Sequence, residues 1–177
     1  MNLITSDSIN LHIGGKQVKD GWRILNAQPG PGVDFVGDIM DLRRFPDNSC
    51  AQIYCSHVLE HVSQNDILNT LRGIHRILQP DGKLYISVPD LDVLCHLFLS
   101  PRLGSNEKFH IMRMIFGGQL DAFDYHKIGL NVTFLADYLE RAGFASMEQV
   151  ENFGLFDDCS NIVAYGFPIS LNVIAIK

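Results

Sequence analysis

The sequence lacks several signatures that would place it in a special class of protein. None of its four cysteines stands in a C-x-x-C pair, which argues against a zinc knuckle or a dithiol redox motif. No apolar run approaches the roughly 18 residues that a membrane-spanning helix needs, so we expect no membrane span. The first ten residues lack the basic start and apolar run of a signal peptide. We therefore expect buried thiols and a cytoplasmic protein.

Positive charge is also scarce. The chain has 14 lysines and arginines against 20 acidic residues, which gives a formal net charge of -6. This balance disfavours binding to nucleic acid or to an anionic membrane surface. The composition, 46% hydrophobic and 19% charged, is that of a globular chain rather than a disordered one. The length of 177 residues predicts one domain spanning residues 1–177.

Strand signals and helix signals alternate along the chain. Strands are predicted over residues 11–13, 23–27, 33–36, 52–56, 83–88, 147–153 and 169–176. Helices are predicted after a capping pair at Ser63 and Asp66, over residues 91–99 and 107–116, and between Asn131 and Gly143. This alternation predicts an α/β fold with a mainly parallel sheet. In such sheets ligands bind beyond the carboxyl ends of the strands.

Two connections in the first half are too short for the usual crossover. Only seven residues separate Gly15 from Arg23, and five separate Ala27 from Val33. A crossover between parallel strands normally takes about a dozen residues or more, because it contains a helix. We therefore expect the first half to have fewer helices than the complete fold. One face of the sheet would then lack its own cover, and we hypothesise that a second copy covers it in a homodimer.

Four blocks in fixed order carry a resemblance to a known family. They read LHIGG at 11–15, VGDI at 36–39, IYCSHVLEH at 53–61 and LQPDGKLYISVPD at 78–90. The series resembles the class I S-adenosylmethionine-dependent methyltransferases, and most of all the small predicted methyltransferases associated with surface-polysaccharide genes. The resemblance extends over nearly the whole chain through FGGQ at 116–119, DYHK at 124–127, AGF at 142–144, FDD at 156–158 and ISLN at 169–172. It implies a Rossmann-like methyltransferase fold with a mainly parallel seven-stranded sheet and an antiparallel last strand.

The resemblance also implies S-adenosylmethionine as cofactor and assigns its amino-acid and ribose parts to the ends of the first two strands. Gly14 and Gly15 would let the backbone approach the amino-acid part closely. Asn26 stands at the ribose position, where the family usually has an acidic residue. A neutral acceptor contributes about 1 kcal/mol per hydrogen bond, against about 1.5–3 kcal/mol for a charged one. We therefore expect weaker cofactor binding than the family norm.

The remaining cofactor roles fall after the third and fourth strands. By the resemblance, Asp38 would meet the adenine amine and Ile39 would lie against the adenine ring. Ser56 and His57 would flank the methyl donor. Each position also has a plainer structural interpretation, since an aspartate after a strand commonly caps the next turn.

Two histidines are candidate bases. His61 and His126 would take a proton only if the methyl acceptor is a hydroxyl group. The resemblance implies a small or sugar-like acceptor, and either histidine could equally be structural. Catalysis itself would come chiefly from holding the acceptor in line with the methyl group.

Two other functions remain open from the sequence. The string from His57 to His61 fits the H-x-x-E-H motif of a zinc peptidase. Clear helix periodicity begins only after Ser63, so we expect no metal there. The second alternative is a non-catalytic, methyltransferase-like module that binds a ligand or a partner through the same cleft, which the short first half and Asn26 favour.

Overall fold

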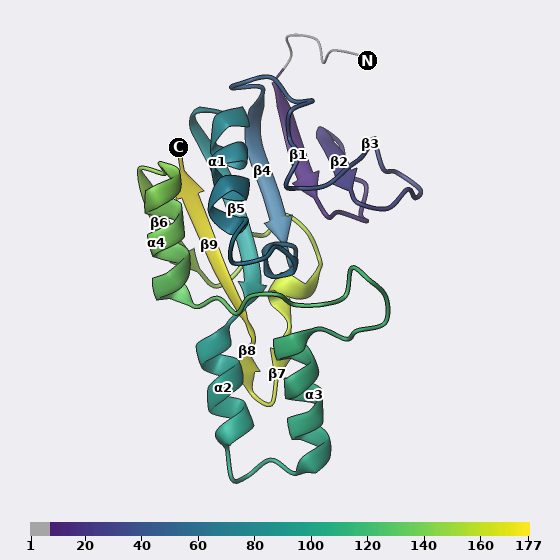
Figure 1. Ribbon diagram of the computed structural model, residues 1–177, viewed down its shortest axis with the longest axis vertical. Coiled ribbons are helices and arrows are strands. Elements are labelled where there is room, and N and C mark those ends of the chain that lie inside the picture. Colours follow the sequence, from purple (N-terminus) through teal and green to yellow (C-terminus); the bar gives the residue numbers. More distant parts are fainter. Residues whose placement is uncertain (1–7) are drawn as a thin grey trace.

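The computed structural model of the protein describes residues 8–177 and contains one large twisted sheet (Figure 1). Its strand order is β3-β2-β1-β4-β5-β9-β6. The strands are β1 (Ile9–Ile13), β2 (Trp22–Asn26), β3 (Phe35–Val36), β4 (Cys50–Ser56), β5 (Leu78–Pro89), β6 (Ser146–Val150) and β9 (Ser170–Ile176). Neighbouring strands are parallel except β9, which runs antiparallel to both β5 and β6. The predicted Rossmann-like methyltransferase sheet is confirmed.

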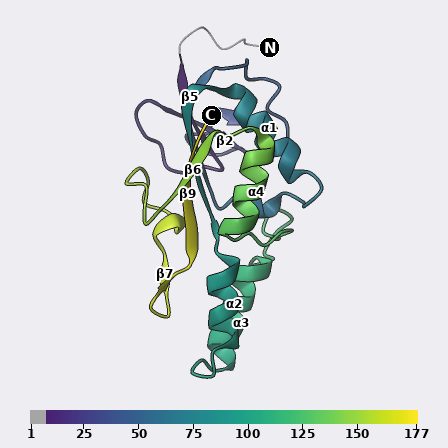
Figure 2. The same cartoon turned by 90° about the vertical axis from the view of Figure 1, so that its left-hand side faces the viewer.

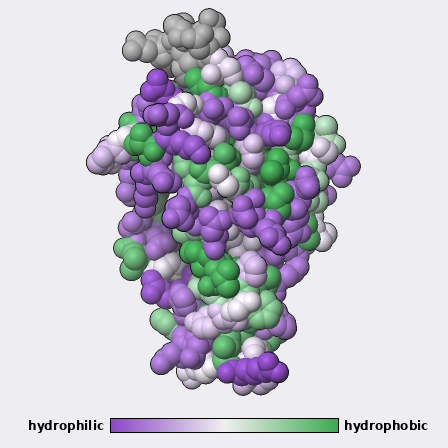
Figure 3. Space-filling view, turned by 180° about the vertical axis from the view of Figure 1, so that it is seen from behind, coloured by the Kyte–Doolittle hydropathy of each residue, from purple (hydrophilic) through white to green (hydrophobic). Residues whose placement is uncertain are grey.

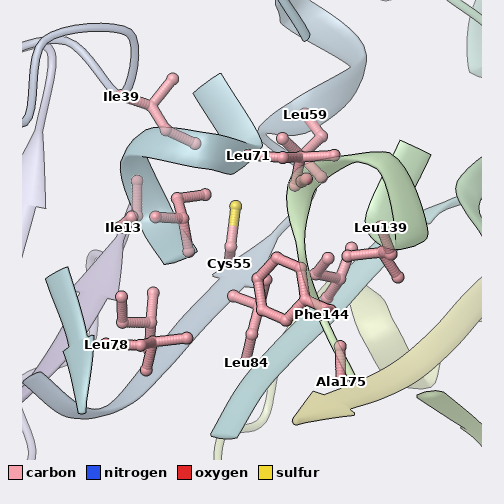
Figure 4. Close-up of a cluster of buried hydrophobic side chains, with 14 of the residues drawn as sticks. Ile13, Ile39, Cys55, Leu59, Leu71, Leu78, Leu84, Leu139, Phe144 and Ala175 are labelled. Atoms are coloured by element: carbon pink, nitrogen blue, oxygen red, sulfur yellow. The ribbon is translucent and has the colours of Figure 1, made fainter. Parts of the chain in front are cut away.

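Helices α1 (Ile67–Ile77) and α4 (Val132–Ala142) cover one face of this sheet (Figure 2). Beneath them the alternate residues of the strands are aliphatic, and Leu11, Leu84 and Leu71 are completely buried. Figure 4 shows this core, to which side chains from β1, β4, β5, β9 and both helices contribute. The continuous apolar character of the buried strands is what a parallel sheet with a helix layer requires.

The ends of these two helices test the predicted capping residues. Asn131 accepts a hydrogen bond from the Phe134 amide at 2.9 Å, and Gly143 ends α4 with a φ of 106°, both as predicted. The prediction for α1 was wrong in detail. Ser63 donates its hydroxyl to the Asp66 carboxylate at 2.6 Å instead of capping a backbone amide, and the helix begins at Ile67.

The connections 14–21 and 27–34 contain no helix, as predicted. The face of the sheet opposite α1 and α4 is nevertheless covered, because residues 151–158 cross it between β6 and η2 (Cys159–Asn161) (Figure 2). This crossing segment explains why β6 stops at Val150, short of the predicted end at 153. The strand predicted over 33–36 is also shorter, since the Asp34 carboxylate accepts the Ile24 amide at 2.8 Å.

Aromatic rings fill the space under the crossing segment. Phe156 lies with its ring centroid 4.1 Å from His12, 4.7 Å from Tyr54 and 5.2 Å from Trp22. Phe153 lies 5.5 Å from the Tyr54 ring. The chain therefore covers this face with its own residues, and the reason for expecting a second copy disappears. The homodimer itself stays a prediction.

The remaining elements form a projecting unit at the carboxyl end of the sheet. It consists of α2 (Leu91–Leu99), α3 (Ser105–Phe116) and the hairpin of β7 (Val163–Ala164) and β8 (Phe167–Pro168). Its own small core contains Leu94, Leu97, Ile111 and Ile169. Apolar side chains also come to the surface in the lower half of the molecule (Figure 3). No helix in residues 8–177 is long and apolar enough to cross a membrane.

Candidate functional site

A cleft of about 590 Å³ opens where the carboxyl ends of β1, β2, β3 and β4 meet. The parallel order of these strands brings together residues that lie far apart in the sequence. The loop that follows α3 forms the opposite wall, through residues 120–125 (Figure 1). The volume is within the range of about 300–1,000 Å³ that small-molecule sites occupy.

Of the two glycines after β1, only Gly14 lines the cleft. Its φ is 76°, and a Cβ at this position would overlap the Val58 side chain, so no other residue fits without a shift. Gly15 is buried behind the wall, where a Cβ would come within 2.6 Å of the His12 ring. Its carbonyl accepts a hydrogen bond from Asn26 Nδ2 at 3.0 Å. Gly14 thus shapes the cleft directly and Gly15 only through its neighbours.

Asn26 lines the cleft at the end of β2. Both ends of its amide are engaged within the chain, since Oδ1 also accepts the Gln28 amide at 3.0 Å. The side chain therefore ties the loop after β1 to the turn after β2. Its oxygen keeps one lone pair for a ligand hydroxyl.

Asp38 and Ile39 follow β3 and both line the cleft. Asp38 is exposed, and its Oδ1 accepts the Met40 amide at 2.9 Å, which fixes the carboxylate at the rim. Ile39 is only 8% exposed because its side chain also packs into the core under α1. The pair offers one charged acceptor beside one apolar surface, which suits a polar aromatic ring.

The two residues at the end of β4 differ in their access to the cleft. Ser56 does not line it, and its hydroxyl is buried with no hydrogen-bond partner among the described residues. His57 does line it and has a φ of 53°, a left-handed backbone conformation that is uncommon outside glycine but that histidine adopts more readily than most residues. Its amide donates to the Ser87 carbonyl at 2.8 Å, and its Nε2 lies 2.9 Å from Ser170 Oγ. These contacts fix the imidazole at the floor of the cleft.

Glu60 lies behind this floor in the short helix η1 (Leu59–His61). It is 2% exposed, and no donor in residues 8–177 is aligned for a hydrogen bond to either carboxylate oxygen. His57 Nδ1 lies 3.3 Å from Oε1, and His126 Nε2 lies 4.0 Å from the same oxygen. In the sequence, Glu60 is the acidic residue of the H-x-x-E-H string, and its alternative interpretation is a structural role. Its place between histidines at 57, 61 and 126 was the signal that could have suggested more.

The two candidate bases stand at different depths. His61 lines the cleft, and its Nδ1 lies 3.1 Å from the Tyr125 carbonyl. His126 lies behind it, with the two rings 4.9 Å apart at centroids and outside the cleft lining. Burial is the main cause that lowers the pKa of His126, against the opposing effect of the Glu60 carboxylate. The deeper imidazole is therefore held in its neutral form.

The structure does not assemble the zinc-peptidase motif from the histidines at its two ends. The side chains that converge are those of Glu60, His61 and His126, whose candidate ligand atoms lie within 4.8 Å of one another. His57 contacts Glu60 and Ser170 instead.

Sequence reasoning missed the loop wall of the cleft. Its lining residues are Leu120, Asp121, Ala122, Phe123, Asp124 and Tyr125. The Asp124 carboxylate accepts the Leu120 amide at 3.2 Å, and Asp121 accepts the Phe123 amide at 2.7 Å. In the sequence, DYHK at 124–127 was noted only as part of the resemblance, and only His126 received a role, because this loop has no periodic pattern.

Comparisons with known proteins agree with this architecture. Residues 7–86 match the family model described as a methyltransferase domain. A search of curated proteins found no significant match.

Among solved structures, an S-adenosylmethionine-dependent methyltransferase from Archaeoglobus fulgidus is 16% identical with a TM-score of 0.60, covering 99% of this chain and 88% of that one. The YcgJ protein of Bacillus subtilis is 15% identical with a TM-score of 0.59, covering 97% and 92% of the two chains. The 1,6-didemethyltoxoflavin-N1-methyltransferase of Burkholderia thailandensis, whose structure holds S-adenosylhomocysteine, is 17% identical with a TM-score of 0.58, covering 97% and 71%. The chain therefore has the Rossmann-like fold of the S-adenosylmethionine-dependent methyltransferases, and residues 7–86 match the methyltransferase-domain family.

Proposed function

We propose that this protein binds S-adenosylmethionine in the cleft and transfers its methyl group to a hydroxyl of a small, sugar-like acceptor. The observation that carries the proposal is the convergence of Gly14, Asn26, Asp38, Ile39 and His57 from the ends of four strands onto one cleft. The methyltransferase-domain match and the methyltransferase fold of the structural neighbours support the same function.

The cleft offers each part of the cofactor a matching surface. The backbone at Gly14 can approach the amino-acid moiety closely because no Cβ intervenes. Asn26 Oδ1 can accept a ribose hydroxyl, and the Asp38 carboxylate can accept the adenine amine while Ile39 packs on the ring. His57 then stands nearest the methyl donor, with its ring held by Ser170. Gly15 and Ser56 support this arrangement from behind the wall.

The acceptor would enter between His61 and the loop at 120–125. Carboxylates at Asp121 and Asp124 can accept hydrogen bonds from hydroxyl groups, and Phe123 and Tyr125 expose rings that can pack on the apolar face of a sugar. His61 reaches the cleft and is the imidazole placed to take a hydroxyl proton. His126, at greater depth, acts as a positioning residue.

A non-catalytic binding module is the second candidate function. It is favoured by one observation, that both ends of the Asn26 amide are already hydrogen-bonded within the chain. Such a module would show no transfer of labelled methyl groups to any acceptor. The cytoplasmic location is a prediction in either case.

The test is calorimetric titration of the purified chain with S-adenosylhomocysteine. We expect micromolar binding that Asp38→Ala weakens at least about tenfold, which corresponds to about 1.4 kcal/mol. Asp41→Ala is the matched control. Asp41 also accepts a backbone amide two residues ahead, from Arg43 at 3.2 Å, but it does not line the cleft. Absence of binding at millimolar ligand would contradict the proposal.

A further inference from the structure

The starting observation is a buried carboxylate that only imidazole rings approach. Glu60 is 2% exposed, and neither of its oxygens receives a hydrogen bond from residues 8–177. No lysine or arginine in that part of the chain forms an ion pair with it, and only imidazoles approach. A buried, unpaired carboxylate is costly, so it is normally paired or bound to a metal. Glu60 therefore needs a cationic partner.

Two imidazoles face this carboxylate in a form that suits a ligand. His61 donates from Nδ1 to the Tyr125 carbonyl at 3.1 Å, which leaves the Nε2 lone pair free. His126 Nε2 lies 4.0 Å from Glu60 Oε1, and the His126 amide donates to the Phe116 carbonyl at the end of α3. Metal-binding histidines characteristically donate their other ring N–H to a backbone carbonyl or a carboxylate, because this fixes the tautomer and the ring orientation.

We propose that Glu60, His61 and His126 form a binding site for one divalent transition-metal ion beside the acceptor end of the cleft. The three ligand atoms lie within 4.8 Å of one another. An ion bound at about 2.1 Å from each would bring them to about 3.4 Å apart, which small side-chain rotations achieve. His57 Nδ1, 3.3 Å from Glu60 Oε1, would orient the carboxylate from behind.

The donor set indicates which ions would bind. Two imidazole nitrogens and one carboxylate oxygen suit Zn²⁺, Fe²⁺, Co²⁺ or Mn²⁺, whereas Mg²⁺ and Ca²⁺ prefer oxygen ligands. This site differs from the expectation of no metal that the H-x-x-E-H string produced. The reason is that His126, distant in sequence, supplies the ligand in place of His57.

What the ion does rests on the proposed function. Because His61 also lines the cleft, water or an acceptor hydroxyl can complete the coordination sphere. A bound hydroxyl loses its proton more easily next to a divalent ion. His61 would then act as a ligand and not as a base, and the acceptor would be a hydroxyl that reaches this end of the cleft.

The test uses the untagged, chelator-treated chain titrated with Co²⁺ and followed by visible absorption, with calorimetry of Zn²⁺ alongside. We expect one ion per chain with micromolar or tighter affinity, and a d–d spectrum typical of nitrogen and oxygen ligands. His61→Gln and His126→Gln should each weaken binding about 100-fold or more, whereas the exposed control His110→Gln should not. Circular dichroism confirms that each variant is folded, and Glu60→Gln provides a third, isosteric test.

Two outcomes would overturn the site. One is the absence of a Co²⁺ spectrum at millimolar metal, and the other is binding that survives both histidine substitutions. Displacement of Co²⁺ by equimolar Mg²⁺ would overturn the assignment to a transition metal. Titration of His126→Gln with S-adenosylhomocysteine separates the two proposals, because the cofactor should bind this variant as it binds the unchanged chain.

Discussion

The two faces of the sheet are covered in different ways. On one face α1 and α4 pack on aliphatic residues, and Leu71 and Leu135 are completely buried there. On the other face the segment 151–158, which contains neither helix nor strand, packs Phe153 and Phe156 on the rings of β1, β2, β4 and β5. A helix packs many side chains on the sheet along its length. The loop packs only a few, and these are large aromatic rings, each of which buries a large apolar area.

The loop-covered face also relies on polar links between the crossing segment and the rest of the chain. Tyr54 donates its hydroxyl to the Asp158 carboxylate at 2.9 Å, and Lys19 donates to the Leu155 carbonyl at 2.7 Å. These bonds fix a segment that has no backbone ladder of its own. In this chain an aromatic cluster and a few specific hydrogen bonds therefore take the place of two helices on this face.

The largest expected effect comes from removing the central ring of that cluster. Phe156→Ala should lower the free energy of unfolding by about 3–5 kcal/mol, comparable with about 2–5 kcal/mol for Leu71→Ala on the helix-covered face. Urea unfolding followed by far-ultraviolet circular dichroism measures both values. Trp22, the only tryptophan, lies 5.2 Å from Phe156 and reports on the loop-covered face by fluorescence.

A comparison of the unfolding transitions seen by fluorescence and by circular dichroism sharpens this prediction. If the cluster is a true second core, fluorescence and dichroism transitions coincide in the unchanged chain. A cost below about 1 kcal/mol for Phe156→Ala would mean that the crossing segment is only a loose cover.

A smaller effect should come from acid. Burial is the main cause that lowers the pKa of His12 from 6.5 to about 4, with Asp158 opposing it. The His12 imidazole therefore binds a proton below about pH 6.5 in the unfolded chain, but only below about pH 4 in the folded chain. Stability should fall by about 3 kcal/mol as the pH drops through this window, since one pKa unit corresponds to about 1.4 kcal/mol.

His12→Leu isolates this contribution, because it removes both the titration and a buried Nδ1 that finds no hydrogen-bond partner among residues 8–177. Urea unfolding at pH 7 and at pH 4.5 should show a clearly smaller loss in this variant, and the usual loss in the exposed control His96→Leu. If the free energy of unfolding of His12→Leu falls between pH 7 and pH 4.5 as much as that of the unchanged chain, the acid sensitivity arises from other groups.

The smallest effect is expected for one polar link. Tyr54→Phe removes the bond to Asp158 and a second contact to Ser160 Oγ at 3.3 Å, which leaves the Asp158 carboxylate without its tyrosine donor. We expect a loss of about 1–2 kcal/mol. Tyr85→Phe is the matched control, since its hydroxyl donates only to Gln52 at 3.1 Å on a less buried part of the same face. Equal losses in the two variants would contradict a special role for the Tyr54 link.

Much of the fold could be predicted from local signals. The spacing of the apolar residues predicts the helices, and Asn131 and Gly143 predict the two ends of α4. The short connections after Gly15 and Ala27 predict that no helix forms there. The cover over the second face could not be predicted, because Phe153 and Phe156 stand in a stretch without periodicity. Their partners lie on strands more than 60 residues away.

The site shows the same division. Gly14, Asn26, Asp38, Ile39 and His57 follow strands, so the topology of a parallel sheet predicts their convergence, and the structure lines the cleft with all five. Gly15 follows a strand and Ser56 ends one, yet their neighbours bury Gly15 and the Ser56 hydroxyl, which no one-dimensional pattern reveals. The grouping of Glu60 with His126 depends on the path of the loop after α3, which only the folded chain defines.

The central claim is that the cofactor occupies the cleft at the carboxyl edge of the sheet. A crystal structure of the chain grown with S-adenosylhomocysteine tests it most directly. We expect the adenine to lie beside Asp38 and Ile39, and the amino-acid moiety to lie against the backbone of Gly14. Ligand density elsewhere, or crystals at saturating ligand with the cleft closed by the loop at 120–125, would contradict it.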